Sequence, residues 1–147
     1  MTVRSMQEVE LSGKRVLIRE DFNVPIKAGK ILNDARIRAA VPTIKYALEK
    51  GAIVILMSHL GRPDEGVPIS EQLEVSLAPV VKRLSELLKN KVDLMPVDFS
   101  ADSAAKLSYG SCVMLENVRC NTGEKSNSDE LSQYYASLCD VFVMDAF

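Results

Sequence analysis

The chain has 147 residues, close to the size of one globular domain, and a formal net charge of -2. Hydrophobic residues make up 47% and charged residues 26% of the sequence, which is ordinary for a folded domain. The nearly balanced charge argues against a protein that coats nucleic acid, because that class carries a large positive surplus.

Five short apolar runs along the chain predict β-strands. They show little polar–apolar alternation, which is typical of strands buried on both faces of a parallel sheet. The predicted strands cover residues 15–18, 52–57, 92–95, 112–115 and 141–144. A lone Gly29 between Pro25 and Leu32 predicts a small hairpin after the first strand.

Helical periodicity fills the segments between these strands. The first apolar stripe at helical spacing begins at Asp34, which we expect to cap the helix, and ends at Gly51. Pro42 lies inside this stripe, where its missing N–H predicts a bend. Three further helices are predicted over 77–88 with Ser76 as the cap, after Ser100, and over 131–138.

This alternation predicts an α/β domain with a parallel sheet and helices on both faces, a Rossmann-like three-layer arrangement. Two long polar loops, 58–74 and 116–127, interrupt the pattern. Loops of that length in a compact domain are usually functional or disordered. The chain stops at Phe147, directly after a buried-type strand, and we therefore expect that it is truncated.

Cysteine usage and hydropathy favour a cytoplasmic protein. The three cysteines, Cys112, Cys120 and Cys139, are an odd number with no C-x-x-C pair, which disfavours a disulfide framework and a zinc site. The sequence has no N-terminal signal core, and its apolar runs are far shorter than the ~20 residues of a membrane helix. We expect free thiols, no bound metal and no membrane segment.

Polar and cationic side chains follow the predicted strands at their carboxyl ends, where open α/β sheets bind ligands. Arg36, in the first turn of the first helix, faces the same rim. Because an arginine fork pairs well with phosphate or carboxylate, the sequence predicts a pocket for a small, multiply anionic, hydroxylated metabolite. The residues at the strand ends are Asp21, Asn23, Ser58, His59, Arg62, Glu116, Asn117, Arg119 and Asp145.

Each of these residues also has a structural interpretation. A single arginine is more often a solvated surface charge, His59 a loop residue, and Asp21 the cap of a turn ahead of Pro25. Their convergence on one rim favours an anion site without defining a reaction. Motifs for other chemistry are missing, since the sequence has no G-x-x-x-x-G-K-[ST] or G-x-G-x-x-G loop, no metal-ligand spacing and no G-x-S-x-G elbow.

Five sequence blocks together span essentially the whole chain. They are R-E-D-F-N-V-P from Arg19, D-A-R-I-R-A-A-V-P-T-I from Asp34, M-S-H-L-G-R-P from Met57, L-E-N-V-R from Leu115 and V-M-D-A-F from Val143. In this order and spacing they resemble the N-terminal domain of the phosphoglycerate kinase family.

The resemblance implies an incomplete N-terminal lobe of a two-lobed glycolytic kinase. Such enzymes transfer a phosphoryl group from 1,3-bisphosphoglycerate to ADP, giving 3-phosphoglycerate and ATP. Residues 1–147 would form the phosphoglycerate-binding domain, and the domain that binds Mg-ATP or Mg-ADP would be absent. The resemblance therefore implies that this chain holds no cofactor, is inactive alone, and comes from a cytoplasmic monomer.

Six residues receive roles from the resemblance. Asp21 and Asn23 would bind the carboxylate and hydroxyl end of the substrate. Arg36 would be the catalytic residue, stabilising charge on the transferring phosphoryl group. The nucleophile of the reverse reaction is a carboxylate, already ionised at neutral pH, so the reaction needs alignment and charge neutralisation rather than a general base. The remote phosphate would be held by His59, Arg62 and Arg119.

The sequence departs from the family pattern at three points. Cys120 stands where Phe is common, which removes an aromatic contact near Arg119. Glu20 stands where a small or aliphatic residue is common, and we expect it at the surface. The Gly-Thr-Ala-His-Arg motif that follows Phe147 in the family, with a further strand of this lobe, is absent, and we expect an exposed sheet edge.

Two other functions stay open at this stage. A non-catalytic module could bind phosphometabolites in the same pocket. A generic doubly wound protein could bind nucleotides, although no glycine-rich loop follows the first strand.

Overall fold

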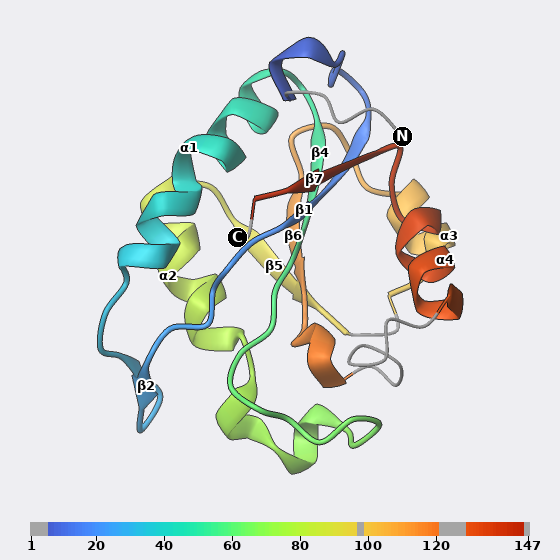
Figure 1. Cartoon of the computed structure of the whole chain (residues 1–147). Coiled ribbons are helices and arrows are strands. Elements are labelled where there is room, and N and C mark those ends of the chain that lie inside the picture. The colour runs from blue at the N-terminus through green and yellow to red at the C-terminus, as the bar shows by residue number, and fades with distance from the viewer. Residues whose placement is uncertain (1–5, 97–98, 121–128, 146–147) are drawn as a thin grey trace.

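The computed structural model describes residues 6–96, 99–120 and 129–145, and within them a five-stranded sheet lies between helices (Figure 1). All four strand pairings are parallel, and the spatial order is β5-β6-β4-β1-β7. The predicted strands are confirmed, and no bound differs by more than one residue. They are β1 (Arg15–Arg19), β4 (Ile53–Met57), β5 (Val92–Met95), β6 (Cys112–Leu115) and β7 (Val141–Met144).

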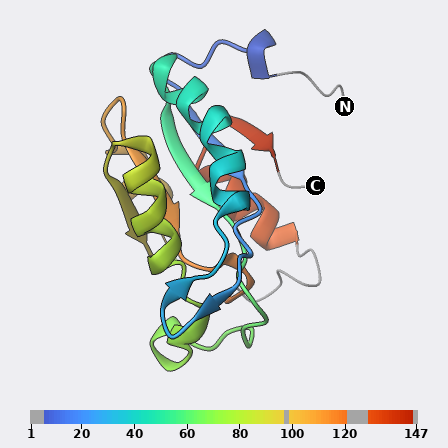
Figure 2. The same ribbon diagram turned by 90° about the vertical axis from the view of Figure 1, so that its left-hand side faces the viewer.

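Helices cover both faces of this sheet, as the turned view also shows (Figure 2). Helices α1 (Ala35–Glu49) and α2 (Ala78–Leu88) lie on one face. The short α3 (Ala101–Ala105) and α4 (Asp129–Ser137) lie on the other. The predicted α/β class with a parallel sheet and helices on both faces is therefore confirmed.

Smaller elements fill the connections. The predicted hairpin is present as β2 (Ile26–Lys27) paired antiparallel with β3 (Lys30–Ile31). The loop that follows β4 contains two 3-10 turns, η2 (Ile69–Glu71) and η3 (Leu73–Val75). Two more turns, η1 (Met6–Glu8) and η4 (Val118–Cys120), lie near the N-terminus and after β6. No helix in the described part of the chain is long and apolar enough to cross a membrane.

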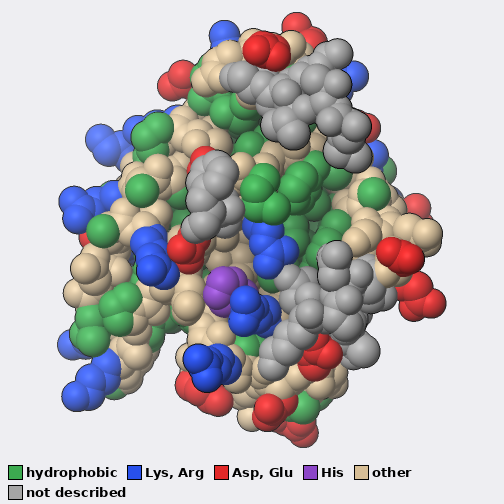
Figure 3. Space-filling view, in the orientation of Figure 1, with side chains coloured by type: hydrophobic (Ala, Val, Ile, Leu, Met, Phe, Trp, Pro, Cys, Tyr) green, Lys and Arg blue, Asp and Glu red, His purple; other side chains and the backbone are tan. Residues whose placement is uncertain are grey.

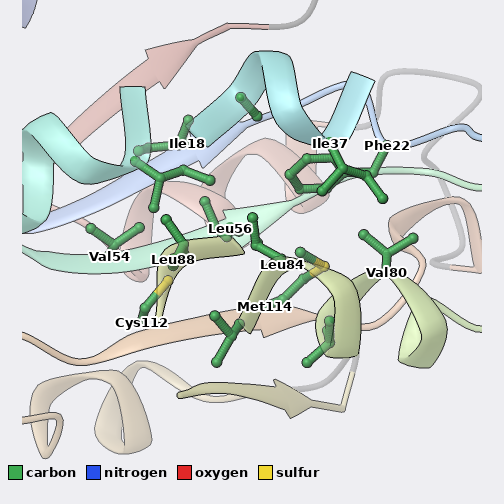
Figure 4. Packing of buried hydrophobic residues seen from close by; sticks show 14 of the residues in the cluster. Ile18, Phe22, Ile37, Val54, Leu56, Val80, Leu84, Leu88, Cys112 and Met114 are labelled. Carbon is green, nitrogen blue, oxygen red and sulfur yellow. The ribbon is translucent and has the colours of Figure 1, made fainter. Parts of the chain in front are cut away.

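Two apolar clusters hold the layers together, because successive side chains of a strand point to opposite faces. In β1, Ile18 packs toward α1 and α2, whereas Leu17 packs toward α3 and α4. Figure 4 shows Ile37 and Leu84 from the two helices closing over the sheet. Each such side chain is fully buried, and burying one stabilises the fold by about 1.5–3 kcal/mol.

The start of α1 differs from the prediction. Asp34 occupies the N-cap position, but its carboxylate accepts no capping hydrogen bond from the first turn in the described structure. It pairs instead with Nε of Arg38 and Nε of Arg83, each at 2.9 Å. The side chain of Asn33 caps in its place, since its Oδ1 accepts from the N–H of Ala35. Asp34 therefore links α1 to α2 rather than capping α1.

The end of α1 agrees with the prediction. Gly51 follows the C-cap residue with a φ of 82°, a left-handed conformation that glycine adopts without strain, and its N–H donates to the carbonyl of Leu48. Pro42 lies inside the helix, which continues on both sides of it.

Candidate functional site

The candidate site lies where the carboxyl ends of neighbouring parallel strands meet. Asp21 and Asn23 follow β1, His59 and Arg62 follow β4, and Arg119 follows β6. These three strands are adjacent in the sheet, so their loops come together at one edge. Lys and Arg side chains gather around the chain's single histidine on this face (Figure 3).

Arg36 is held directly by two of the predicted residues. Its Nη1 donates to the backbone carbonyl of Asn23 at 2.6 Å and lies 3.4 Å from Oδ1 of Asp21. Oδ1 of Asp21 also accepts from the N–H of Asn23 at 3.2 Å, so Asp21 does cap a turn as well as orient the arginine. The Arg36 side chain is 55% exposed, which leaves its outer edge open to an anion.

Asn23 joins the loop after β1 to the loop after β4. Its Oδ1 accepts from the N–H of Gly61 at 2.9 Å. Gly61 has a φ of 61°, and a Cβ at this position would lie 3.1 Å from Cγ1 of Val75. This close backbone approach therefore requires glycine. The bond occupies the amide oxygen of Asn23 and leaves Nδ2 as its group for a ligand.

Ser58 also links the loop after β1 to the loop after β4. Its side chain is fully buried, and its Oγ accepts from the N–H of Phe22 at 2.9 Å while donating to the carbonyl of His59 at 3.0 Å. The hydroxyl thus sets the direction of the chain on either side of the candidate residues.

Asn117 connects the loop after β4 to the loop after β6. It is fully buried, and its Nδ2 donates to the carbonyls of Leu60 at 2.7 Å and Val75 at 2.9 Å. Its Oδ1 accepts from the N–H of Arg119 at 3.2 Å. A single side chain therefore joins the segment carrying His59 to the one carrying Arg119.

Glu116, which follows β6, accepts hydrogen bonds from residues at the start of α2. Its Oε1 accepts from the N–H groups of Leu77 and Asn117 at 2.7 and 3.0 Å, and its Oε2 accepts from the hydroxyl of Ser76 at 2.7 Å. The prediction that Ser76 caps α2 is wrong in position. The N-cap residue is Leu77, and Ser76 lies one residue earlier, where its Oγ accepts from the N–H of Ala78.

The six predicted residues therefore fall into two groups. Asp21, Asn23 and Arg36 touch one another. His59 and Arg119 are half-buried and Arg62 is exposed, on loops that Ser58 and Asn117 tie to that cluster. The sequence placed Ser58, Glu116 and Asn117 at the strand ends but gave them no role. The signal was present, because each is a polar residue within two positions of the end of an apolar run.

Glu20 contradicts its predicted surface position. It is only 3% exposed, because the backbone past β1 still pairs with β4 through the N–H of Glu20 and the carbonyl of Met57. Burial raises the pKa of the Glu20 carboxyl to about 9, helped by its hydrogen bond to the Asp145 side chain and by the negative charges of Asp145 and Asp21. The Cys120 side chain, the other departure, lies outside the described residues.

The described residues offer no cluster of metal-ligating side chains. Within residues 6–96, 99–120 and 129–145, no three His, Cys, Asp or Glu side chains are grouped so as to hold a metal ion. The two cysteines whose side chains are described, Cys112 and Cys139, are free, and burial raises the pKa of the Cys112 thiol to about 12. The exposed guanidinium of Arg36 suits an anion.

Comparisons with known proteins point to one family. The model of the family described as phosphoglycerate kinase matches residues 6–147. The solved structure of phosphoglycerate kinase from Coxiella burnetii is 48% identical with a TM-score of 0.86, and the match covers 96% of this chain and 34% of that one. The phosphoglycerate kinase from Pyrococcus horikoshii OT3 is 29% identical with a TM-score of 0.80, covering 96% and 36%. The chain thus spans about a third of the length of these proteins.

Proposed function

The chain belongs to the phosphoglycerate kinase family, and from this premise we propose that it forms the phosphoglycerate-binding part of such an enzyme. The observation that carries the proposal is the arginine of α1, held on Asp21 and Asn23 at the carboxyl edge of the sheet with its outer face open. A fixed, solvent-facing guanidinium at this edge is suited to bind a phosphoryl or carboxylate oxygen.

The hydrogen bonds of Asp21, Asn23 and Arg36 leave a different atom of each residue available to the ligand. Oδ1 of Asp21 carries the contacts to Arg36 and to the N–H of Asn23, which leaves Oδ2 to accept a ligand hydroxyl. Nδ2 of Asn23 is the group that would donate to a ligand oxygen, because its Oδ1 is bound by Gly61. The three residues would thus bind the reacting end of phosphoglycerate, with Arg36 as the catalytic residue beside the transferring group.

The remote phosphate would be bound by the second group of cations. His59, Arg62 and Arg119 lie on the two loops joined through Asn117, so their spacing depends on buried hydrogen bonds rather than on the surface loops alone. Arginine pairs with phosphate in a planar, two-point geometry, which would fix the substrate's length and direction.

The chemistry that we propose is phosphoryl transfer between 1,3-bisphosphoglycerate and ADP, giving 3-phosphoglycerate and ATP. The acceptor in the reverse direction is a carboxylate, which needs no proton removed at neutral pH. The contribution of this chain is to align that carboxylate and to neutralise charge with Arg36.

We do not propose a nucleotide site on this chain. Because the chain spans about a third of the length of its relatives, we assign Mg-ATP and Mg-ADP to a separate domain of such an enzyme and expect no turnover by this chain alone. A cytoplasmic location and a monomeric state are part of the same proposal. Two apolar side chains of β7, Phe142 and Met144, are about half exposed. A monomer would therefore leave part of the apolar surface of this strand in contact with solvent.

A non-catalytic module that binds phosphometabolites is the second candidate, because the same cluster would serve binding without transfer. A thermal unfolding series can test the binding that both functions share. We expect 3-phosphoglycerate to raise the Tm of the wild type and Mg-ATP to leave it unchanged. Arg36→Ala should lose the shift, whereas Arg38→Ala should keep it, since Arg38 is a similarly exposed arginine of α1 that pairs with Asp34.

Protection by Mg-ATP without protection by 3-phosphoglycerate would contradict both candidates and favour a nucleotide-binding protein. The two candidates separate on transfer itself. When the nucleotide domain of a relative is fused to this chain, formation of ATP from 1,3-bisphosphoglycerate supports the enzyme, and binding without turnover supports the module.

A further inference from the structure

A buried acid pair lies beside Arg36 and has no part in the substrate contacts proposed above. Glu20 follows β1 and Asp145 follows β7, the neighbouring strand. Both are fixed by backbone bonds, since the N–H of Glu20 donates to the carbonyl of Met57 and the N–H of Asp145 to the carbonyl of Arg19, each at 2.9 Å. Their side chains are hydrogen-bonded to each other.

One oxygen of this pair has no partner. Oε1 of Glu20 is buried and receives no hydrogen bond from any described atom. Solvent cannot supply one either, because the residue is only 3% exposed. A hollow of about 330 Å³ lies against the pair. It is lined by Glu20, Asp21, Arg36, Ala39, Ala40 and Asp145.

The charges facing Glu20 do not favour its ionised form. Asp145 from β7 and Asp21 from the end of its own strand are both acidic. Arg36 from α1 is the cation across the hollow, but its described hydrogen bonds go to Asp21 and Asn23. Ionising a buried carboxyl beside two other acids is costly, so we expect Glu20 to keep its proton and donate it to Asp145 at neutral pH.

We propose that Glu20 is a positioning residue of the anion site, which shares one proton with Asp145 and thereby limits the negative charge on the wall beside Arg36. This inference rests on the proposed function, because it concerns the same site. The neutral acid holds Asp145 in place and lets an anionic ligand approach Arg36. Loss of the proton at alkaline pH adds a second charge to the pair and repels the ligand.

The expected size follows from Coulomb's law. One added charge ~10 Å from a ligand carrying three negative charges weakens binding by about tenfold in a water-like dielectric. By linkage, ligand binding should raise the pKa of Glu20 further by about one unit. The effect should appear around the pKa of about 9 and not near neutrality.

The experiment measures two things on the same 147-residue chain. The first is the infrared band of a protonated carboxylic acid at neutral pH, in the wild type, in Glu20→Gln and in the exposed control Glu49→Gln. The second is the ratio of the Kd for 3-phosphoglycerate about one pH unit above the pKa of Glu20 to the Kd at neutral pH. Glu20→Val serves as a second variant should the glutamine variant fail to fold.

We expect the band in the wild type and in Glu49→Gln, and its loss in Glu20→Gln. The Kd ratio should be about ten in the first two and near one in the third. A missing band, or the same Kd ratio in Glu20→Gln as in the wild type, would overturn the inference while leaving the anion site intact. No binding of 3-phosphoglycerate at any pH would contradict the proposed function. If the infrared band were still seen in that case, the Glu20–Asp145 pair would serve folding alone, and the positioning role would be overturned.

Discussion

Replacing Asn117 by alanine tests whether one buried amide holds the loops of the site together. The change removes the donor to the carbonyls of Leu60 and Val75 and the acceptor of the Arg119 N–H. A buried polar group left without its partner costs about 1–3 kcal/mol. Because Leu60 is itself buried, we expect Asn117→Ala to lower the free energy of unfolding by about 2–4 kcal/mol.

Urea unfolding followed by circular dichroism would measure this loss as a shift of the midpoint at constant m-value. The matched control is Asn33→Ala, which removes one exposed capping bond to the N–H of Ala35 and should cost no more than about 1 kcal/mol. Asn117→Ala should also weaken 3-phosphoglycerate binding, since Arg119 loses its anchor. A loss in Asn117→Ala no larger than in the control would refute the reasoning.

Three further predictions follow from single contacts. Hydrogen bonds and charge from Arg83 and Arg38 hold the pKa of Asp34 below its usual value, and they outweigh the opposing effect of burial. The ion pairs of Asp34 therefore stabilise the fold fully at pH values above the pKa of Asp34 in the unfolded chain. This stabilisation is lost as the pH falls through the lower pKa of the folded chain. Asp34→Asn should therefore be less stable than the wild type at neutral pH and converge with it in acid, and a difference independent of pH would contradict this. Gly61→Ala should destabilise the chain by about 1 kcal/mol or more, because of its positive φ and the contact with Val75; an unchanged urea midpoint would exclude that strain. In a full-length enzyme carrying this region, Arg36→Ala should lower kcat far more than it raises KM, and equal effects on both would argue against a role in transfer.

Much of the fold follows from short-range patterns. The strands of residues 112–115 and 141–144 have the predicted bounds, because a run of β-branched and apolar residues between turns is itself the physical cause of a buried strand. The helices follow from the spacing of their apolar faces. Strand order does not, because it depends on long-range packing that no local window of sequence contains.

The site was predictable in outline and not in its contacts. The rule that ligands bind at the carboxyl ends of parallel strands located Asp21, Asn23 and Arg36 at one rim, and these three do touch. The burial of Glu20 depends on how far the β1–β4 pairing continues past the strand, which the sequence does not show. Glu116 could not be assigned to α2, because it lies about forty residues from Leu77 along the chain and meets it only after folding.

The same limit explains the error at Asp34. An aspartate before an apolar stripe is usually a helix cap, and this local rule overlooks a cation brought from another helix. Arg83 of α2 reaches the Asp34 carboxylate at 2.9 Å, and the exposed Asn33 takes over the cap. Local rules therefore fail where a tertiary partner offers the same side chain a charged contact.

The most direct test of the central claim is a calorimetric titration of the chain with 3-phosphoglycerate at moderate salt. We expect saturable binding that weakens as salt is raised, because the contacts are ionic. Arg62→Ala should remove most of this binding and Arg38→Ala should leave it, since Arg38 pairs with Asp34 instead. Absence of binding by the folded wild type, or equal binding by Arg62→Ala, would contradict a preformed phosphoglycerate site at this edge of the sheet.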